Sequence, residues 1–239
     1  MNWPDDFINK IICGDCLEVM GSLPAGSIDL IQADPPYSFE NLSIYSPSSF
    51  LYKTKKQYLK NIEESFGSKF DPEECLETSM QIMKKYNAYW WCSKDLVPKY
   101  INWALKKKFS FNILGWNKFN PVPLKNNNYL PDTEYCIFMR EEGAYFNSRL
   151  KNLEKYRKFH TTNIGGNTRG EYHPPKKPLF IIKSQIEISS SKGSIILDPF
   201  LGSGTTSVAC KELNRNFIGI EINPDYCKIA EERLAQGVL

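Results

Sequence analysis

Two short segments of this chain have residue types that could hold a substrate and a cofactor. The first is Asp34-Pro35-Pro36-Tyr37, which follows the apolar run 28–33. Proline fixes its own φ and pushes the preceding residue into an extended conformation. The two prolines would therefore hold the Asp34 carboxylate, the adjacent carbonyl groups and the Tyr37 ring in one arrangement. This arrangement suits a catalytic site, although a strand that merely ends in a proline-rich turn has the same pattern.

The second segment is a glycine turn that follows the apolar run 194–197. Gly202 and Gly204 would let the backbone approach a ligand and would expose amide groups at the start of a helix. Glu221 ends the next expected strand, about 20 residues on, where a carboxylate can bind ribose hydroxyls. The pattern indicates a nucleoside-cofactor site; the alternative is a tight turn that serves packing alone. It is not the nicotinamide fingerprint, because Ser207 stands at the position of the third glycine.

The elements that must position these two turns alternate between strand and helix. Hydrophobic periodicity and turn residues predict strands at 8–12, 28–33, 87–93, 109–116, 133–139, 194–197 and 217–222, and helices at 16–23, 72–86, 96–107, 179–188, 205–213 and 224–234. Residues 38–60 and 120–128 are expected to be loops. The alternation predicts an α/β fold with a doubly wound, mostly parallel sheet. Both turns would then lie at the carboxyl edge of the sheet, where ligands of such folds bind.

Composition narrows the class of protein. The chain has 239 residues, 41% of them hydrophobic, which fits one α/β domain with a modest insert. It has no apolar run of membrane-spanning length and no apolar signal region after Met1, so a cytoplasmic location is expected. Seven cysteines at irregular spacing fit reduced thiols. Cys13 and Cys16 form a lone Cys-x-x-Cys, and without a second ligand pair no metal site is expected.

Charge is concentrated in the middle of the chain. Residues 99–183 contain 16 Lys or Arg and 6 Asp or Glu (+10), whereas the remainder contains 14 and 21 (−7), which gives the net charge of +3. Within 141–172, basic residues alternate with aromatic ones, as on surfaces that bind nucleic acids. A solvated lysine-rich face is the alternative. We expect 141–172 to be an insert that grips a polyanion.

The motifs together resemble those of the amino-group DNA methyltransferases, which act on adenine N6 or cytosine N4. The segment 198–206 is similar to their S-adenosylmethionine motif, and 34–37 is similar to their catalytic motif. The order, with the catalytic motif first, resembles the permuted β class of N6-adenine enzymes. Gly14-Asp15-Cys16 and the segment 173–178 resemble two further stretches of the cofactor pocket. The resemblance covers nearly the whole chain and is weakest over 38–86 and 141–170.

The resemblance implies a Rossmann-like methyltransferase fold in circularly permuted order and a role for each motif residue. Residues 1–140 would form the catalytic half, 141–172 a target-recognition insert and 173–239 the cofactor-binding half. Implied catalytic residues are Asp34, Pro35, Pro36 and Tyr37; implied cofactor-binding residues are Asp15, Cys16, His173, Lys177, Asp198, Phe200, Gly202, Ser203, Gly204, Thr205, Glu221 and Asn223. Pro175-Lys176 stands where the family more often has Thr-Gln, a departure beside Lys177.

The implied reaction is direct methyl transfer from S-adenosylmethionine to an exocyclic amino group of a base flipped out of double-stranded DNA. Asp34 at the first motif position favours adenine N6. Cytosine N4, an RNA substrate and a non-catalytic nucleic-acid-binding subunit are the alternatives. No cysteine follows a proline as in C5-cytosine enzymes, so covalent attack on the ring is not expected. A homodimer and a companion restriction endonuclease are possible partners under this resemblance.

Overall fold

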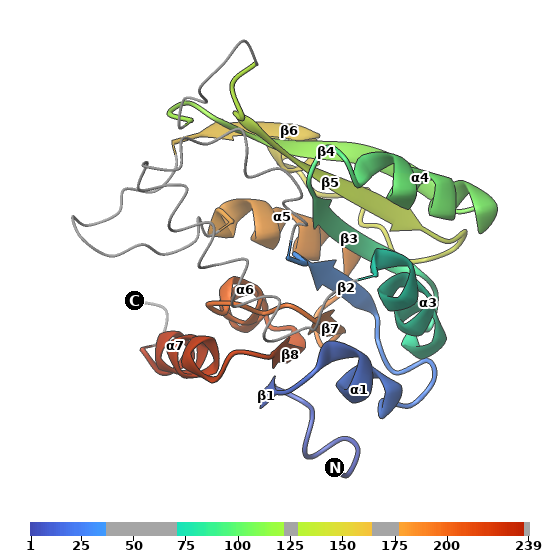
Figure 1. Cartoon of the computed structure of the whole chain (residues 1–239), viewed down its shortest axis with the longest axis vertical. Helices are drawn as coiled ribbons and strands as arrows, with labels where there is room; N and C mark the ends of the chain where they lie inside the picture. Colours follow the sequence, from blue (N-terminus) through green and yellow to red (C-terminus); the bar gives the residue numbers. More distant parts are fainter. Residues whose placement is uncertain (37–70, 122–128, 164–176, 237–239) are drawn as a thin grey trace.

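The computed structural model describes residues 1–36, 71–121, 129–163 and 177–236 (Figure 1). The strands are β1 (Lys10–Cys13), β2 (Leu30–Ala33), β3 (Asn87–Cys92), β4 (Ser110–Lys118), β5 (Thr133–Arg140), β6 (Phe159–Thr162), β7 (Ile195–Asp198) and β8 (Asn216–Glu221). The helices are α1 (Cys16–Gly21), α3 (Pro72–Ile82), α4 (Val97–Lys106), α5 (Leu179–Ser189), α6 (Thr205–Glu212) and α7 (Pro224–Ala235), with a 3₁₀ turn η2 (Leu153–Tyr156). Among the helices of these residues, none is long and apolar enough to cross a membrane.

The strands form one sheet of order β1-β8-β7-β2-β3-β5-β4-β6. β5 runs antiparallel to both of its neighbours, and the other pairs are parallel. The predicted doubly wound, mostly parallel sheet is therefore confirmed. β1 pairs with β8, as expected for the permuted order, so the first and last strands lie side by side. The carboxyl ends of all strands except β5 share one edge of the sheet.

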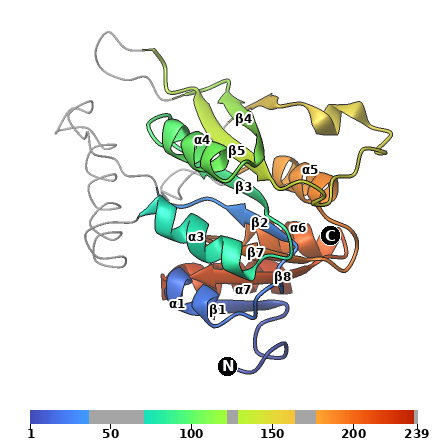
Figure 2. The ribbon, with the colours of Figure 1, turned by 90° about the vertical axis from the view of Figure 1, so that its right-hand side faces the viewer.

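Helices cover both faces of the sheet (Figure 2). One core packs the sheet against α1, α3 and α4, and the other packs it against α5 and α6. The alternation along β2 shows how the sequence specifies this layering: Leu30 belongs to the second core, whereas Ile31 and Ala33 belong to the first. Because successive side chains of a strand point to opposite faces, a strand buried on both sides reads as a continuous apolar run.

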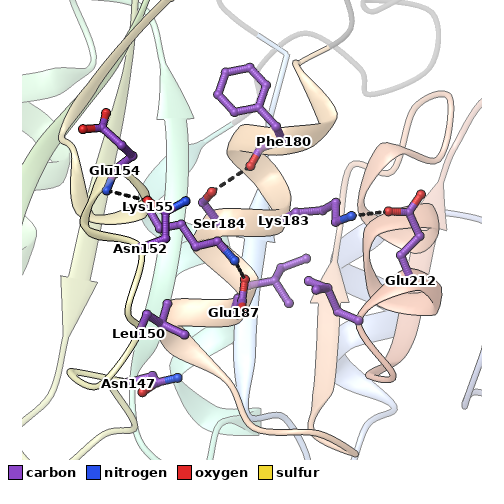
Figure 3. A network of polar contacts seen from close by, with 12 residues as sticks. Asn147, Leu150, Asn152, Glu154, Lys155, Phe180, Lys183, Ser184, Glu187 and Glu212 are labelled. Atoms are coloured by element: carbon purple, nitrogen blue, oxygen red, sulfur yellow. Dashed lines mark hydrogen bonds and ion pairs between the residues drawn. The ribbon is translucent and has the colours of Figure 1, made fainter.

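The described part of the expected insert, 141–163, is tied to the sheet and to α5. β6 adds to the edge of the sheet by pairing with β4, a strand that the sequence did not predict. Before it, Lys155 forms an ion pair with Glu187 of α5, and Asn152 accepts a hydrogen bond from the Glu154 amide (Figure 3). The Asn147 amide also donates to the Ile188 carbonyl. This segment therefore packs around the carboxyl end of α5, at the amino edge of the central strands.

Most predicted boundaries agree with the structure to within a few residues. The helix expected at 72–86 is shorter, because Met83 leaves α3 and bridges to Ile28 beside the sheet. Asp71 caps α3 by accepting from the Glu73 amide, and Pro72 occupies the first turn as the sequence indicated. The loop expected at 38–60 and most of that at 120–128 lie outside the described residues.

Candidate active site

The turn that begins at Asp34 and is predicted to be catalytic leaves the sheet at the end of β2. β2 lies between β7 and β3 and is parallel to both, with Ala33 opposite Trp90. Asp34 is the next residue; its side chain is 36% exposed, whereas Pro35 is buried. A rigid, buried backbone thus presents a carboxylate at the carboxyl edge of the central strands. Tyr37 lies outside the described residues, so its predicted stacking role stays a prediction.

The glycine turn follows β7, the neighbour of β2. Gly202 and Gly204 both have positive φ, 53° and 84°, which glycine adopts without strain. They differ in their surroundings. A Cβ at position 202 would have its nearest neighbour, the Phe200 carbonyl oxygen, at 4.0 Å, whereas one at 204 would lie 2.9 Å from the Cβ of Ala230. Gly202 therefore leaves space beside the backbone for a ligand, and Gly204 lets α6 begin against α7.

The Asp198 carboxylate holds this turn together. Its Oδ1 accepts from the Phe200 amide at 3.0 Å, and its Oδ2 accepts from the Thr206 hydroxyl at 2.5 Å. Burial raises the pKa of Asp198 to about 7, against the opposing effect of these two hydrogen bonds. Phe200 is buried within the turn, and Thr205 is the first residue of α6. Asp198 thus has a structural task in addition to any contact with a cofactor.

Glu221 ends β8 and faces the same turn. Its Oε2 accepts from the Gly202 amide and its Oε1 accepts from the Asn223 amide, each at 2.8 Å. Burial raises the pKa of Glu221, and these backbone amides oppose the shift. A carboxylate has about four acceptor positions, so both oxygens keep capacity for ligand hydroxyls. Asn223 caps α7 by accepting from the Asp225 amide.

The remaining predicted cofactor residues lie around these turns. Asp15 follows β1, which is parallel to β8, and caps α1 by accepting from the Leu17 and Glu18 amides. Cys16 is buried in the first turn of α1. Ser203 contacts Arg233 of α7 through its carbonyl and hydroxyl oxygens. His173 lies outside the described residues. Among the described residues, no group of three or more His, Cys, Asp or Glu could hold a metal ion.

Lys177 lies beside the Asp34 carboxylate. Its ammonium donates to Asp34 Oδ2 at 2.5 Å and lies 5.1 Å from the centre of the Trp91 ring. Burial disfavours the charged ammonium, but the carboxylates of Asp34 and Glu134 outweigh it and raise the pKa of Lys177. Lys177 is therefore a permanent cation beside the Asp34 carboxylate. Its predicted contact with the cofactor stays a prediction.

Sequence reasoning missed Glu134 and Lys118. Glu134 Oε2 lies 2.9 Å from the Lys177 ammonium, and its other oxygen pairs with Lys118 of β4. Although burial disfavours a carboxylate, the two ammonium groups hold the pKa of Glu134 below its ordinary value. One feature of the sequence could have indicated Glu134: it is a carboxylate inside a predicted strand, and buried Glu is rare unless it is paired.

Several basic residues expected to bind a polyanion lie toward the amino edge of the sheet. Arg149, Lys151 and Lys155 precede β6 and lie toward the amino edge, away from Asp34. Lys155 and Arg157 form ion pairs within the protein, with Glu187 and Glu154 respectively. At the carboxyl edge, exposed apolar side chains follow β4 and precede β5: Phe119 is 72% exposed, Tyr129 99% and Leu130 53%.

Comparison with known proteins agrees with this geometry. The model of the N6_N4_Mtase family, described as "DNA methylase", matches residues 28–232. The chain therefore belongs to this DNA methylase family. It is 32% identical over 243 residues to the Type II methyltransferase M2.MboI of Moraxella bovis, with 96% of this chain and 88% of the relative covered. It is also 32% identical to M2.DpnII of Streptococcus pneumoniae over 244 residues, covering 95% of this chain and 90% of the relative.

Solved structures share the fold. The crystal structure of the M1.HpyAVI–SAM complex has a TM-score of 0.65 and 25% identity, covering 94% of this chain and 98% of that one. The cytosine-N4-specific PvuII DNA methyltransferase has a TM-score of 0.69 at 14% identity, covering 94% of this chain and 85% of that one. The second likeness concerns the fold alone.

Proposed function

We propose that this DNA methylase transfers a methyl group from S-adenosylmethionine to the exocyclic N6 amino group of adenine in double-stranded DNA. The observation that carries the proposal is the placement of the Asp34 carboxylate directly after β2 and of the glycine turn directly after β7, because these two strands are adjacent and parallel. A substrate at the first and a cofactor at the second would lie in reach of each other. We also propose a cytoplasmic location and, from the Type II relatives, a companion restriction endonuclease; a homodimer stays a prediction.

The residues around the glycine turn fit S-adenosylmethionine, which supplies an electrophilic sulfonium methyl group. Open space beside Gly202 admits a ligand close to the backbone. Glu221, held by two backbone amides, would accept the ribose hydroxyls. Asp15 and Cys16 would meet the adenine ring and Phe200 would pack against it, while the amides at the start of α6 would face the carboxylate of the methionine part.

The catalytic turn would hold the base amine. An exocyclic amine is a weak nucleophile because its lone pair is delocalised into the ring. The Asp34 carboxylate and the Pro35 carbonyl would each accept one N–H, fixing the nitrogen in line with the methyl group and drawing electron density onto it. The amino nitrogen would take the methyl group that S-adenosylmethionine supplies in place of one hydrogen, and that proton would leave to solvent by way of Asp34.

The DNA would lie across the carboxyl edge of the sheet. A base within a duplex cannot reach Asp34, so it must be flipped out. Phe119 follows β4 and Tyr129 precedes β5, so both exposed rings lie at this edge, where aromatic rings can stack on bases. The basic residues that precede β6 lie toward the other edge and are less well placed for this contact.

Transfer of labelled methyl from S-adenosylmethionine to duplex DNA tests the proposal. The parent chain is expected to label DNA, whereas Asp34→Ala is expected to bind the cofactor normally and to lose transfer. Label on RNA but not on DNA would contradict the DNA substrate. Absence of label on any nucleic acid, with the cofactor bound, would favour a non-catalytic binding subunit.

A further inference from the structure

Four charged side chains form a series of ion pairs that ends at the Asp34 carboxylate: two lie on the neighbouring strands β4 and β5, one precedes α5 and one follows β2. Lys118 on β4 pairs with Glu134 at the start of β5; Glu134 pairs with Lys177; Lys177 pairs with Asp34 beyond β2. Their charges alternate and sum to zero. The Lys177, Lys118 and Glu134 side chains are only 7%, 11% and 13% exposed, compared with 36% for Asp34. Solvent can therefore reach the Asp34 carboxylate more readily than the other three charged groups.

The register of the sheet places Glu134 at the same edge as the turn that begins at Asp34. Cys92, the last residue of β3, pairs with Tyr135, so Glu134 projects one residue further at the carboxyl edge of the central strands. The Trp91 ring packs near the Lys177 ammonium, and the Trp116 ring lies 5.2 Å from the Lys118 ammonium. Both lysines are therefore restrained by a ring as well as by carboxylates.

The Lys177 ammonium has two carboxylate partners from separate parts of the sheet: Asp34, which follows β2, and Glu134 of β5. Together these carboxylates fix the position of the ammonium between them. We propose that Glu134 is a positioning residue for methyl transfer: through Lys177 it holds the Asp34 carboxylate in the orientation that receives the base amine. This inference deepens the proposed function and rests on it.

A double-mutant cycle on methyl transfer tests whether Glu134 acts through Lys177. Glu134→Gln keeps the shape of the side chain and removes its charge. Because small displacements of a reacting group can cost about 100-fold in rate, we expect kcat to fall by about that factor, with KM for DNA and for S-adenosylmethionine unchanged within about twofold. Lys177→Met should lose at least as much. The double variant should be no slower than Lys177→Met alone.

Glu212→Gln is the matched control. Glu212 pairs with Lys183 of α5 (Figure 3), and its side chain is likewise 13% exposed. It is the last residue of α6 and belongs to neither of the two turns of the proposed site. It should leave kcat unchanged. If Glu134→Gln and Lys177→Met both raise KM, or if kcat of Glu212→Gln falls as much as that of Glu134→Gln, Glu134 has only a structural role. If the losses of Glu134→Gln and Lys177→Met multiply in the double variant, Glu134 does not act through Lys177.

These outcomes separate the inference from the proposed function. If the parent is active and the losses of the two single variants multiply in the double variant, the inference is overturned and the proposed function stays intact. A parent that transfers no methyl group to DNA overturns the proposed function and the inference with it.

Discussion

Replacing Gly204 by alanine tests whether the glycine turn is built for packing at one position and for ligand approach at the other. Gly204 has φ 84°, and an added Cβ would lie 2.9 Å from the Cβ of Ala230 and 3.1 Å from its Cα. The left-handed conformation costs an alanine about 1–2 kcal/mol. Overpacking against a backbone that cannot move far costs about 1–3 kcal/mol more. Gly204→Ala should therefore lower the free energy of unfolding by about 2–5 kcal/mol.

Two further glycines separate these costs. Gly193 has φ 80° and no heavy atom within 4 Å of an added Cβ, so Gly193→Ala should show the conformational cost alone. Gly202→Ala should likewise cost only about 1–2 kcal/mol of stability but should weaken S-adenosylmethionine binding, because its Cβ enters the space left for the ligand. Urea denaturation and calorimetric binding measure the two quantities. Equal stability losses for Gly204→Ala and Gly193→Ala would refute the packing role.

Three further predictions concern the same edge of the sheet. Burial raises the pKa of Asp198 to about 7 in the folded state, whereas an unfolded Asp has a pKa of about 4. The free energy of unfolding should therefore fall as pH rises between these two values. In Asp198→Asn, the free energy of unfolding measured with urea should change less across that range. Glu221→Gln should raise the calorimetric Kd for S-adenosylmethionine by about 10- to 100-fold, because a charged hydrogen bond is lost; an unchanged Kd would exclude the ribose contact. In steady-state assays, Tyr129→Ala and Phe119→Ala should raise KM for DNA by about 5- to 100-fold, whereas Lys151→Ala should not. A rise in KM with Lys151→Ala but not with the two aromatic variants would contradict DNA binding at the carboxyl edge.

The two turns could be predicted because each combines a local pattern with a position at the end of an apolar strand. Asp34 follows a run buried on both faces, and Gly202 and Gly204 follow another. Parallel strands bring such ends to one edge whatever their separation in the chain. The fold class followed from the alternation of strands and helices, and the pairing of β1 with β8 was expected from the permuted motif order.

The rest depends on contacts between distant residues. β6 has only four residues, Phe159–Thr162, inside a basic stretch, and it forms because β4 offers a free edge. Glu134 lies 43 positions from Lys177 and 100 from Asp34, so no spacing in the sequence reveals that they meet. Lys177 was expected beside the cofactor, and its ion pair with Asp34 became visible only in three dimensions.

Identification of the methylated nucleoside is the most direct test of the central claim. Duplex DNA labelled by the parent chain and by Asp34→Ala would be digested to nucleosides and separated. The proposed function predicts label in N6-methyldeoxyadenosine with the parent and none with Asp34→Ala. Label in N4-methyldeoxycytidine would contradict the adenine assignment, and undiminished label with Asp34→Ala would contradict the catalytic role of the turn after β2.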